Sequence, residues 1–196
     1  MESISAGAWW CAQGGWTSPT PRTTTEVFYV FSGHGCVTDK DGTRHFMGPG
    51  DLVVLPKGWA GRWDVLADIH KVWFVTDHPD ADDTSNPSAT VRPYNTFAPQ
   101  YLQNSAGSGG IVSTESSSVY ANPYMEVGCS TVAPGTYPVQ TSSGECFHVL
   151  EGLFFLTNSD GSARRCVAGD TVCLPKNWSG SWDVLEPVKK LWVDAA

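Results

Sequence analysis

The sequence has no apolar run that approaches the length of about 18 residues needed for a membrane-spanning helix. Basic residues are few: 12 lysines and arginines stand against 20 acidic residues, which gives a formal net charge of −8. This charge disfavours nucleic acids and anionic membranes as partners. The N-terminal residues also lack the basic segment and apolar stretch of a secretory signal. We therefore expect a soluble cytoplasmic protein that binds neither nucleic acid nor membrane.

None of the six cysteines belongs to a C-x-x-C pair, so the sequence gives no indication of a zinc ribbon. Several lie within apolar runs, as Cys173 does between Val172 and Leu174, where a free thiol packs as a small hydrophobic group. We expect these thiols to be reduced, in keeping with a cytoplasmic location.

The sequence also lacks long segments with the apolar spacing of a helix. It has short apolar runs instead, such as Val27–Phe31 and Leu52–Leu55, and clusters of Gly, Pro, Asp and Ser separate many of them. The dipeptide Asp41-Gly42 lies between two strand-like runs and is typical of a β-hairpin. This pattern predicts an all-β protein, either a sandwich or a barrel.

One segment of the chain occurs twice. Gly50–Leu66 reads GDLVVLPKGWAGRWDVL, and Gly169–Leu185 reads GDTVCLPKNWSGSWDVL. Pro56 and Pro175 are 119 positions apart (175 − 56 = 119), and so are the other matching residues. Solenoid units are shorter and more numerous, so this repeat indicates a duplicated domain. The same offset joins further identical pairs: Glu26 and Glu145, Phe28 and Phe147, Trp63 and Trp182, Lys71 and Lys190.

The duplication predicts two domains, which we place at residues 1–78 and 101–196. Between them we expect a linker over residues 79–100, because Asp77–Gln100 is rich in Pro, Asp, Ser and Thr.

Two motifs in each half resemble those of the cupin superfamily. Glu26–Gly33 and Glu145–Gly152 are similar to the end of the first cupin motif, E-x-x-Y-V-L-x-G, and Gly50–Gly61 and Gly169–Gly180 are similar to the second. The ending P-K-G-W-x-G-x-W-x-V resembles the subfamily of ureidoglycolate and ureidoglycine enzymes, which includes ethanolamine-utilisation-type cupins. The resemblance implies a bicupin, with two β-jelly-roll barrels that each enclose a cavity.

The resemblance also defines where a metal would bind, since many cupins use two His and a Glu from the first motif and a His from the second. Glu26 matches the Glu, but Pro19–Arg22 contains no His and Gly61 stands in place of the last ligand. The second half is incomplete in the same way, with Glu145 as its matching ligand and Gly180 in place of the His. A catalytic metal normally needs about three protein ligands. We therefore expect no metal and no other cofactor; the alternative is an unusual metal site formed by Glu26, Cys11 and one displaced His.

Side chains alternate along a strand, so if Glu26 faces the cavity, Phe28 does too. The second-motif strand would direct Trp63 inward in the same way. A carboxyl group between apolar walls keeps its proton more readily than one in water, which suits acid/base catalysis. We predict two catalytic residues, Glu26 and Glu145. The predicted substrate-binding residues are Cys11, Phe28, Trp63, Phe147 and Trp182.

Each of these residues also has a structural interpretation. The two glutamates would then accept hydrogen bonds and hold the barrels together, while Trp63 and Trp182 would fill the cores. Cys11 would be an inert thiol, at a place on its strand similar to that of Cys129. His148 follows Glu145 by three positions, so we expect it to point to the opposite face.

Two main functions fit these observations. One is a metal-independent enzyme that acts on a small polar metabolite by carboxylate acid/base chemistry in a barrel cavity. The alternative is a non-catalytic bicupin that binds or senses a small molecule. A structural role through association is a third, with a homodimer as its simplest form. The first half keeps more of the motif, including Tyr29 and Gly58, so we predict Glu26 as the working carboxylate and Glu145 as the structural one.

Overall fold

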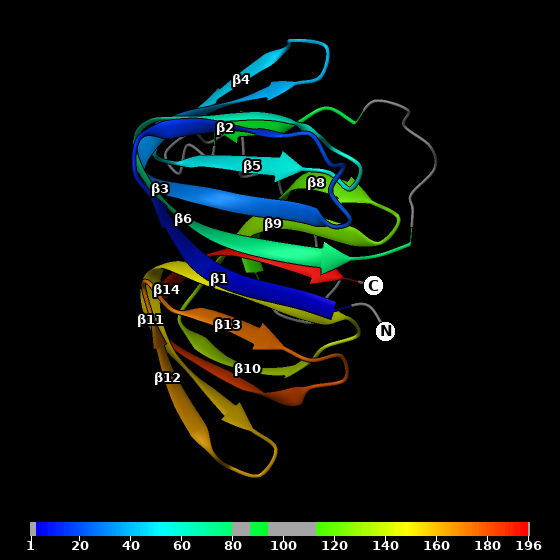
Figure 1. The fold of residues 1–196 in the computed structure, drawn as a ribbon. Helices are drawn as coiled ribbons and strands as arrows, with labels where there is room; N and C mark the ends of the chain where they lie inside the picture. Colours follow the sequence, from blue (N-terminus) through cyan, green and yellow to red (C-terminus); the bar gives the residue numbers. More distant parts are fainter. Residues whose placement is uncertain (1–2, 80–86, 94–112, 196) are drawn as a thin grey trace. The chain divides into compact units, whose positions relative to one another are not determined.

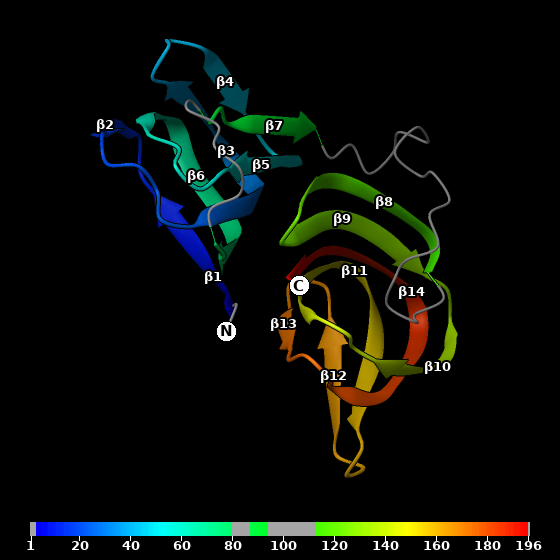
Figure 2. The same ribbon diagram turned by 90° about the vertical axis from the view of Figure 1, so that its right-hand side faces the viewer.

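The computed structural model describes residues 3–79, 87–93 and 113–195. These residues form strands, turns and loops without a helix, so the predicted all-β class is confirmed. The chain divides into two compact units, Met1–Phe97 and Ala98–Ala196. Each unit has its own seven-stranded antiparallel sheet, whose strands curve around an interior (Figures 1 and 2). The described residues contain no helix long and apolar enough to cross a membrane.

The sheet of unit 1 has the strand order β1-β6-β3-β5-β7, while β2 pairs with β6 and β4 pairs with β3. Its strands are β1 (Ser3–Cys11), β2 (Gly14–Ser18), β3 (Thr25–Asp39), β4 (Arg44–Met47), β5 (Asp51–Leu55), β6 (Gly61–Asp77) and β7 (Thr90–Pro93).

The sheet of unit 2 has the order β12-β11-β14-β9-β8, while β10 pairs with β14 and β13 pairs with β11. Its strands are β8 (Ser113–Asn122), β9 (Met125–Val132), β10 (Gly135–Gln140), β11 (Gly144–Asn158), β12 (Ala163–Val167), β13 (Thr171–Leu174) and β14 (Ser179–Ala195).

Two long strands form the centre of each unit, β3 with β6 in unit 1 and β11 with β14 in unit 2. The register of each pair shifts near its middle, for example between Val30 and His34 in β3. Such irregularities bend a strand, which allows one long strand to line two sides of a barrel. Inward side chains of these strands, including Phe28 and Trp63, form the apolar core of unit 1, and Phe147 and Trp182 form that of unit 2.

The turns follow their sequence signals. The backbone N–H of Gly42 donates to the carbonyl of Asp39 at 3.0 Å, which closes the predicted hairpin between β3 and β4. Gly58 has a φ of 86° in the turn before β6, and Asn177 has a φ of 64° at the equivalent place. Glycine and asparagine tolerate this left-handed region better than other residues, which explains the exchange between the two copies.

The first unit extends beyond the boundary predicted at residue 78. Thr90–Pro93 forms β7, which pairs with β5, and Ala89 is buried in the core. These residues fall inside the predicted linker. They nevertheless belong to the barrel of unit 1, because they cover the edge of the apolar strand β5. The rest of that linker, at residues 80–86 and 94–100, lies outside the described residues.

The predicted equivalence of Cys11 and Cys129 is wrong. Cys11 lies opposite Ile69, and the residue opposite the equivalent Val188 is Val132, three positions after Cys129. Before the first motif, equivalent residues of the two copies are therefore 121 positions apart (132 − 11 = 121), whereas Ile69 and Val188 are 119 apart. The second copy is thus two residues shorter in the segment between β10 and β11 than the first copy is between β2 and β3.

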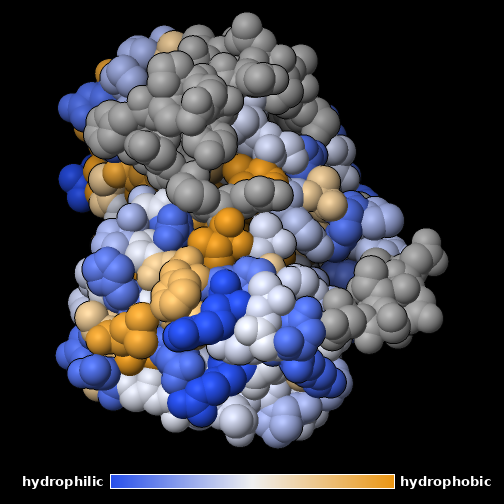
Figure 3. Space-filling view, turned by 90° about the horizontal axis from the view of Figure 1, so that it is seen from above, coloured by the Kyte–Doolittle hydropathy of each residue, from blue (hydrophilic) through white to orange (hydrophobic). Residues whose placement is uncertain are grey.

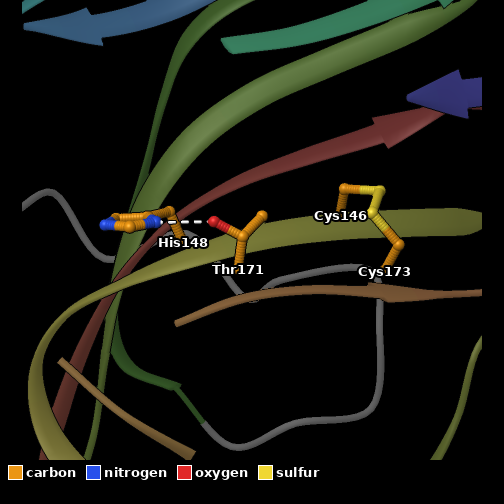
Figure 4. The surroundings of a disulfide bond; sticks show 4 residues. All are labelled: Cys146, His148, Thr171 and Cys173. Atoms are coloured by element: carbon orange, nitrogen blue, oxygen red, sulfur yellow. Dashed lines mark hydrogen bonds between the residues drawn. A yellow bond between two sulfur atoms is a disulfide. The ribbon is translucent and has the colours of Figure 1, made fainter. Parts of the chain in front are cut away.

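The prediction that all thiols are reduced is wrong for Cys146 and Cys173, which form a disulfide (Figure 4). The register of β11 and β13 places these two residues directly opposite each other, with their Cα atoms 4.0 Å apart. In unit 1 the equivalent cross-strand pair is Val27 and Val54. The remaining cysteines, which are Cys11, Cys36, Cys129 and Cys166, do not take part in a disulfide.

Large apolar side chains at the surface are scattered. Figure 3 shows hydrophobic residues in small groups among hydrophilic ones on one face. In the part of the chain that the structure describes, the exposed large hydrophobic residues are Trp10, Trp16, Phe46, Leu66 and Leu185.

Candidate functional site

The candidate site of unit 1 is built around an ion pair between Glu26 on β3 and Lys71 on β6. The Lys71 Nζ atom lies 2.6 Å from Oε1 of Glu26, and the two side chains are 6% and 11% exposed. Charged groups are rarely buried to this degree without a partner of opposite charge. Each residue therefore explains the burial of the other.

Aromatic rings surround the Lys71 ammonium group. Its Nζ atom lies 3.8 Å from the ring centroid of Phe28 and 4.9 Å from those of Trp9 and Trp63. Ring faces attract cations, so these contacts support the positive charge that Glu26 neutralises. Trp16 stacks on Trp63 at a centroid distance of 5.8 Å and extends the aromatic wall.

Arg22 brings a second cation to Glu26. Its Nη1 atom lies 3.0 Å from Oε2 of the glutamate, on the other oxygen from the one that Lys71 contacts. Its backbone is fixed by two hydrogen bonds, one to the carbonyl of Trp59 at 2.9 Å and one from the N–H of Gly58 at 2.8 Å. The Nε atom of Arg22 is buried and has no hydrogen-bond partner among the described residues.

These side chains line a pocket of about 330 Å³ in unit 1. This volume is at the lower end of the range for small-molecule sites, which begins near 300 Å³. The lining residues are Trp9, Trp16, Ser18, Arg22, Glu26, Trp63, Lys71, Trp73 and Val75. With two cations and one carboxylate, the ionised lining carries a net charge of +1.

Burial is the main reason why the pKa of Lys71 lies below its ordinary value. The charge of Glu26 and its hydrogen bond act in the opposite direction, and the Arg22 guanidinium lowers the pKa further. Lys71 therefore holds its proton less firmly than a lysine in water. A group with this property beside a carboxylate is suited to proton transfer.

Unit 2 has a related ion pair between Glu145 on β11 and Lys190 on β14. The Lys190 Nζ atom lies 4.7 Å from the ring centroid of Phe147 and 5.0 Å from that of Trp182. The pair of charges and its aromatic support thus occur in both copies.

The surroundings of the second pair differ. Thr141 stands where unit 1 has Arg22 (22 + 119 = 141), and its backbone makes the same two hydrogen bonds, with Trp178 at 2.9 Å and Asn177 at 3.0 Å. Asp194 takes the place of Val75 (75 + 119 = 194). Unit 2 therefore replaces the second cation by a hydroxyl group and adds a carboxyl group.

The strand register identifies two more differences. Trp9 pairs with Lys71, and Ser130 pairs with the equivalent Lys190. Trp16 lies opposite Trp63, and Tyr137 lies opposite Trp182. The walls formed by Trp9 and Trp16 are thus specific to unit 1.

Burial raises the pKa of Asp194 to about 7, and the negative charges of Glu145 and Glu126 contribute in the same direction. The positive charge of Lys190 opposes them. Asp194 lies directly opposite Glu145 on β11 and Glu126 on β9, which accounts for these effects.

The structure brings most of the predicted site residues together within each unit. Glu26 and Trp63 line the pocket of unit 1, and Phe28 lies against Lys71. Cys11 packs against the same core, but its thiol donates to the Ala12 carbonyl at 3.3 Å, and it does not line the pocket. In unit 2 the predicted residues Glu145, Phe147 and Trp182 surround Lys190.

His148 faces away from this group, as strand alternation predicts. Its Nδ1 atom lies 2.8 Å from Oγ1 of Thr171, the residue opposite it on β13 (Figure 4).

The expectation of an isolated carboxylate between apolar walls is wrong, because Lys71 and Arg22 both contact Glu26. Sequence reasoning missed these two cations. A signal for the lysine was present, since it is one of the pairs at the offset of 119 and directly precedes the apolar run Val72–Val75. Arg22 lies in the short segment where the motif would place histidines, and the motif assigns no role to an arginine there.

Solved structures of cupin barrels share the fold of this chain. A cupin 2 conserved barrel domain protein from Leptotrichia buccalis is 13% identical, with a TM-score of 0.67, covering 100% of this chain and 84% of that protein. A protein of unknown function of the DUF861 family from Pseudomonas syringae is 17% identical with a TM-score of 0.71, covering 98% and 82%. A variant of oxalate decarboxylase from Bacillus subtilis is 14% identical with a TM-score of 0.63, covering 99% and 69%. At these identities the similarity shows the fold alone, which is that of a protein with two cupin barrels.

The family follows from the sequence itself. The model of the EutQ-like cupin domain matches residues 1–73 and 124–192, once in each half of the chain. The chain therefore belongs to the EutQ-like cupin family. No curated protein is similar enough to serve as a relative.

The residues around Glu26 do not fit the metal site that the cupin resemblance implies. Two cations already contact this carboxylate, and a divalent ion beside them would be repelled. A Cβ atom at Gly61 would lie 2.2 Å from the carbonyl oxygen of Thr38, so the backbone leaves no room for a histidine there. Within the described ranges, no group of three or more His, Cys, Asp or Glu residues could hold a metal ion.

Proposed function

We propose that the pocket of unit 1 binds a small polar metabolite and exchanges protons with it through Glu26 and Lys71, without a metal. The observation that carries this proposal is the buried contact of 2.6 Å between the two side chains, both of which line an accessible pocket. A bound molecule would therefore meet a carboxylate and an ammonium group at the same time.

The two groups have complementary roles in this proposal. Glu26 accepts a proton from the bound molecule, and Lys71 donates one to an atom that gains negative charge, so that the pair returns to its starting state when the protons are redistributed. Isomerisation, dehydration, cyclisation and hydrolysis all use such paired transfers.

A second candidate function is binding or sensing without turnover. The observation in its favour is that unit 2 keeps the ion pair, as Glu145 and Lys190, without the arginine and two of the tryptophans of unit 1. Because the Glu–Lys ion pair occurs in both units, it is not tied to the pocket of unit 1 and need not take part in a reaction.

The test incubates the wild-type protein and its variants with a mixture of small polar metabolites that includes ureido acids. Proton NMR detects which metabolites each protein binds or converts. The proposal predicts that the wild-type protein converts a metabolite, that Glu26→Gln and Lys71→Met lose this conversion by at least a hundredfold, and that Glu145→Gln keeps it. Glu26→Asp, which retains the charge, serves as the variant for comparison if Glu26→Gln folds poorly.

Two results would decide against the enzyme. Equal conversion by Glu26→Gln and the wild type would remove the assigned role, and binding without conversion would favour the sensing function. Metal independence has its own readout: treatment with a chelator should leave both binding and conversion unchanged.

A further inference from the structure

We propose that the unit 1 pocket selects a small monocarboxylate with a flat apolar body, and that Arg22 is the residue that binds its carboxylate group. This inference rests on the proposed function, because it names the class of molecule that the same pocket accepts.

The first argument is the charge of the pocket. Arg22 and Lys71 contribute two positive charges, and Glu26 neutralises one of them. A ligand with a single negative charge would balance the other. A dianion such as a phosphate ester would exceed the net charge of +1 and would also meet the carboxylate of Glu26.

The second argument is the unused donor capacity of Arg22. A guanidinium group has five N–H donors in a planar fork, and its geometry matches a carboxylate. The contact with Glu26 is made through Nη1, while the buried Nε atom has no hydrogen-bond partner among the described residues. The guanidinium group therefore keeps donor capacity that a carboxylate in the pocket can use.

Lys71 is less suited to this role. Its ammonium group already contacts Glu26 and lies within 5 Å of the ring centroids of Phe28, Trp9 and Trp63. Arg22 is more exposed, with 26% of its side chain accessible, so a ligand that enters the pocket can reach it.

The third argument is the shape of the walls. Trp16 and Trp63 stack with an angle of 6° between their planes, and Trp9 packs edge-on against both of them. Trp73 also lines the pocket. Extended aromatic surfaces favour a flat apolar body over a strongly hydrated chain.

Unit 2 is not expected to bind the same molecule. Thr141 replaces the arginine, and Asp194 adds an acidic group beside Glu145. An anion there would face two carboxyl groups and one lysine, so the chain should bind one carboxylate rather than two.

Titration calorimetry with benzoate, benzamide and benzylamine at low salt tests this inference, because the three probes share a ring and differ in charge. Benzoate should bind with one site per chain and at least tenfold more tightly than either of the others. Arg22→Gln should weaken benzoate binding at least tenfold and change benzamide binding less than threefold. Arg22→Lys, which keeps the charge without the fork, should fall between Arg22→Gln and the wild type.

Arg44→Gln is the matched control, since Arg44 lies on β4 over the ring of Phe46 and does not line the pocket. It should leave benzoate binding unchanged. Equal affinity for benzoate and benzamide, binding at two sites, no binding of any probe, or full benzoate affinity in both Arg22 variants would each overturn the inference. These results concern binding only, so they can fail while conversion that depends on Glu26 is retained, and the reverse.

Discussion

Asp194 on β14 lies directly opposite Glu145 on β11, whereas the equivalent residue in unit 1, opposite Glu26, is Val75. This exchange and the replacement of Arg22 by Thr141 give the two related ion pairs different electrostatic surroundings. In unit 1 the carboxylate has two cations and an apolar neighbour across the strand. In unit 2 it has one cation and a second carboxyl group.

The pH dependence of stability should therefore depend on Asp194. Its pKa of about 7 in the folded protein exceeds the value of about 3.9 for an aspartate in an unfolded chain. The folded state binds the additional proton between these two values, so the contribution of Asp194 to stability falls as the pH rises from about 4 through 7.

Urea denaturation of the wild type and of Asp194→Asn at pH 5 and pH 8 measures this effect. The wild type should lose on the order of 2 kcal/mol more than the variant between the two pH values. An identical pH dependence in the two proteins would contradict the raised pKa.

The two glutamates should differ in their effect on folding, and in the opposite order to the sequence-based prediction that Glu145 is the structural one, because two cations contact Glu26 and one contacts Glu145. Glu26→Gln leaves both Lys71 and Arg22 without a counter-charge, so we expect a loss of about 3–5 kcal/mol in the free energy of unfolding. Glu145→Gln leaves Asp194 beside Lys190, and this carboxyl group can ionise in its place, so the loss should be about 1–3 kcal/mol.

Chemical denaturation at pH 7 compares these variants, and Glu145→Gln combined with Asp194→Asn serves as the control. The double variant should lose more stability than Glu145→Gln alone. If Glu145→Gln proves at least as damaging as Glu26→Gln, compensation by Asp194 is refuted.

The disulfide should stabilise unit 2. Cys146 and Cys173 are separated by 27 positions in the sequence, and closing a loop of this size contributes about 2–4 kcal/mol. Reduction, or the substitution Cys173→Ser, should lower the free energy of unfolding by this amount. Cys11→Ser removes a free thiol from unit 1 and should have a smaller effect. Equal unfolding curves with and without reductant would argue against the bond.

Much of the fold could be predicted because it follows from local patterns. Strand alternation correctly placed Phe28 and Trp63 in the core, and Asp41-Gly42 correctly marked a hairpin. The repeat also correctly implied that both halves form a barrel, and each is built around an equivalent pair of long strands, β3 with β6 and β11 with β14.

The contacts of the candidate site could not be predicted in the same way, because they depend on the register between strands that are far apart in the sequence. Lys71 follows Glu26 by 45 positions, and the contact arises only because β3 pairs with β6 in one particular register. The disulfide has the same origin, since Cys146 meets Cys173 through the pairing of β11 with β13. β7 escaped prediction because its four residues lie in a segment of linker-like composition.

Hydrogen exchange into a bound ligand tests the central claim, which is that Glu26 and Lys71 exchange protons with a small molecule in unit 1. Proton NMR in D₂O would follow deuterium incorporation into the carbon-bound positions of metabolites in a mixture of small carboxylates and ureido acids. The account predicts incorporation into at least one of them by the wild type and by Lys190→Met, and a rate at least a hundredfold lower with Lys71→Met. Incorporation by Lys71→Met at the wild-type rate would contradict it, and so would the finding that the wild type neither exchanges nor converts any metabolite that it binds.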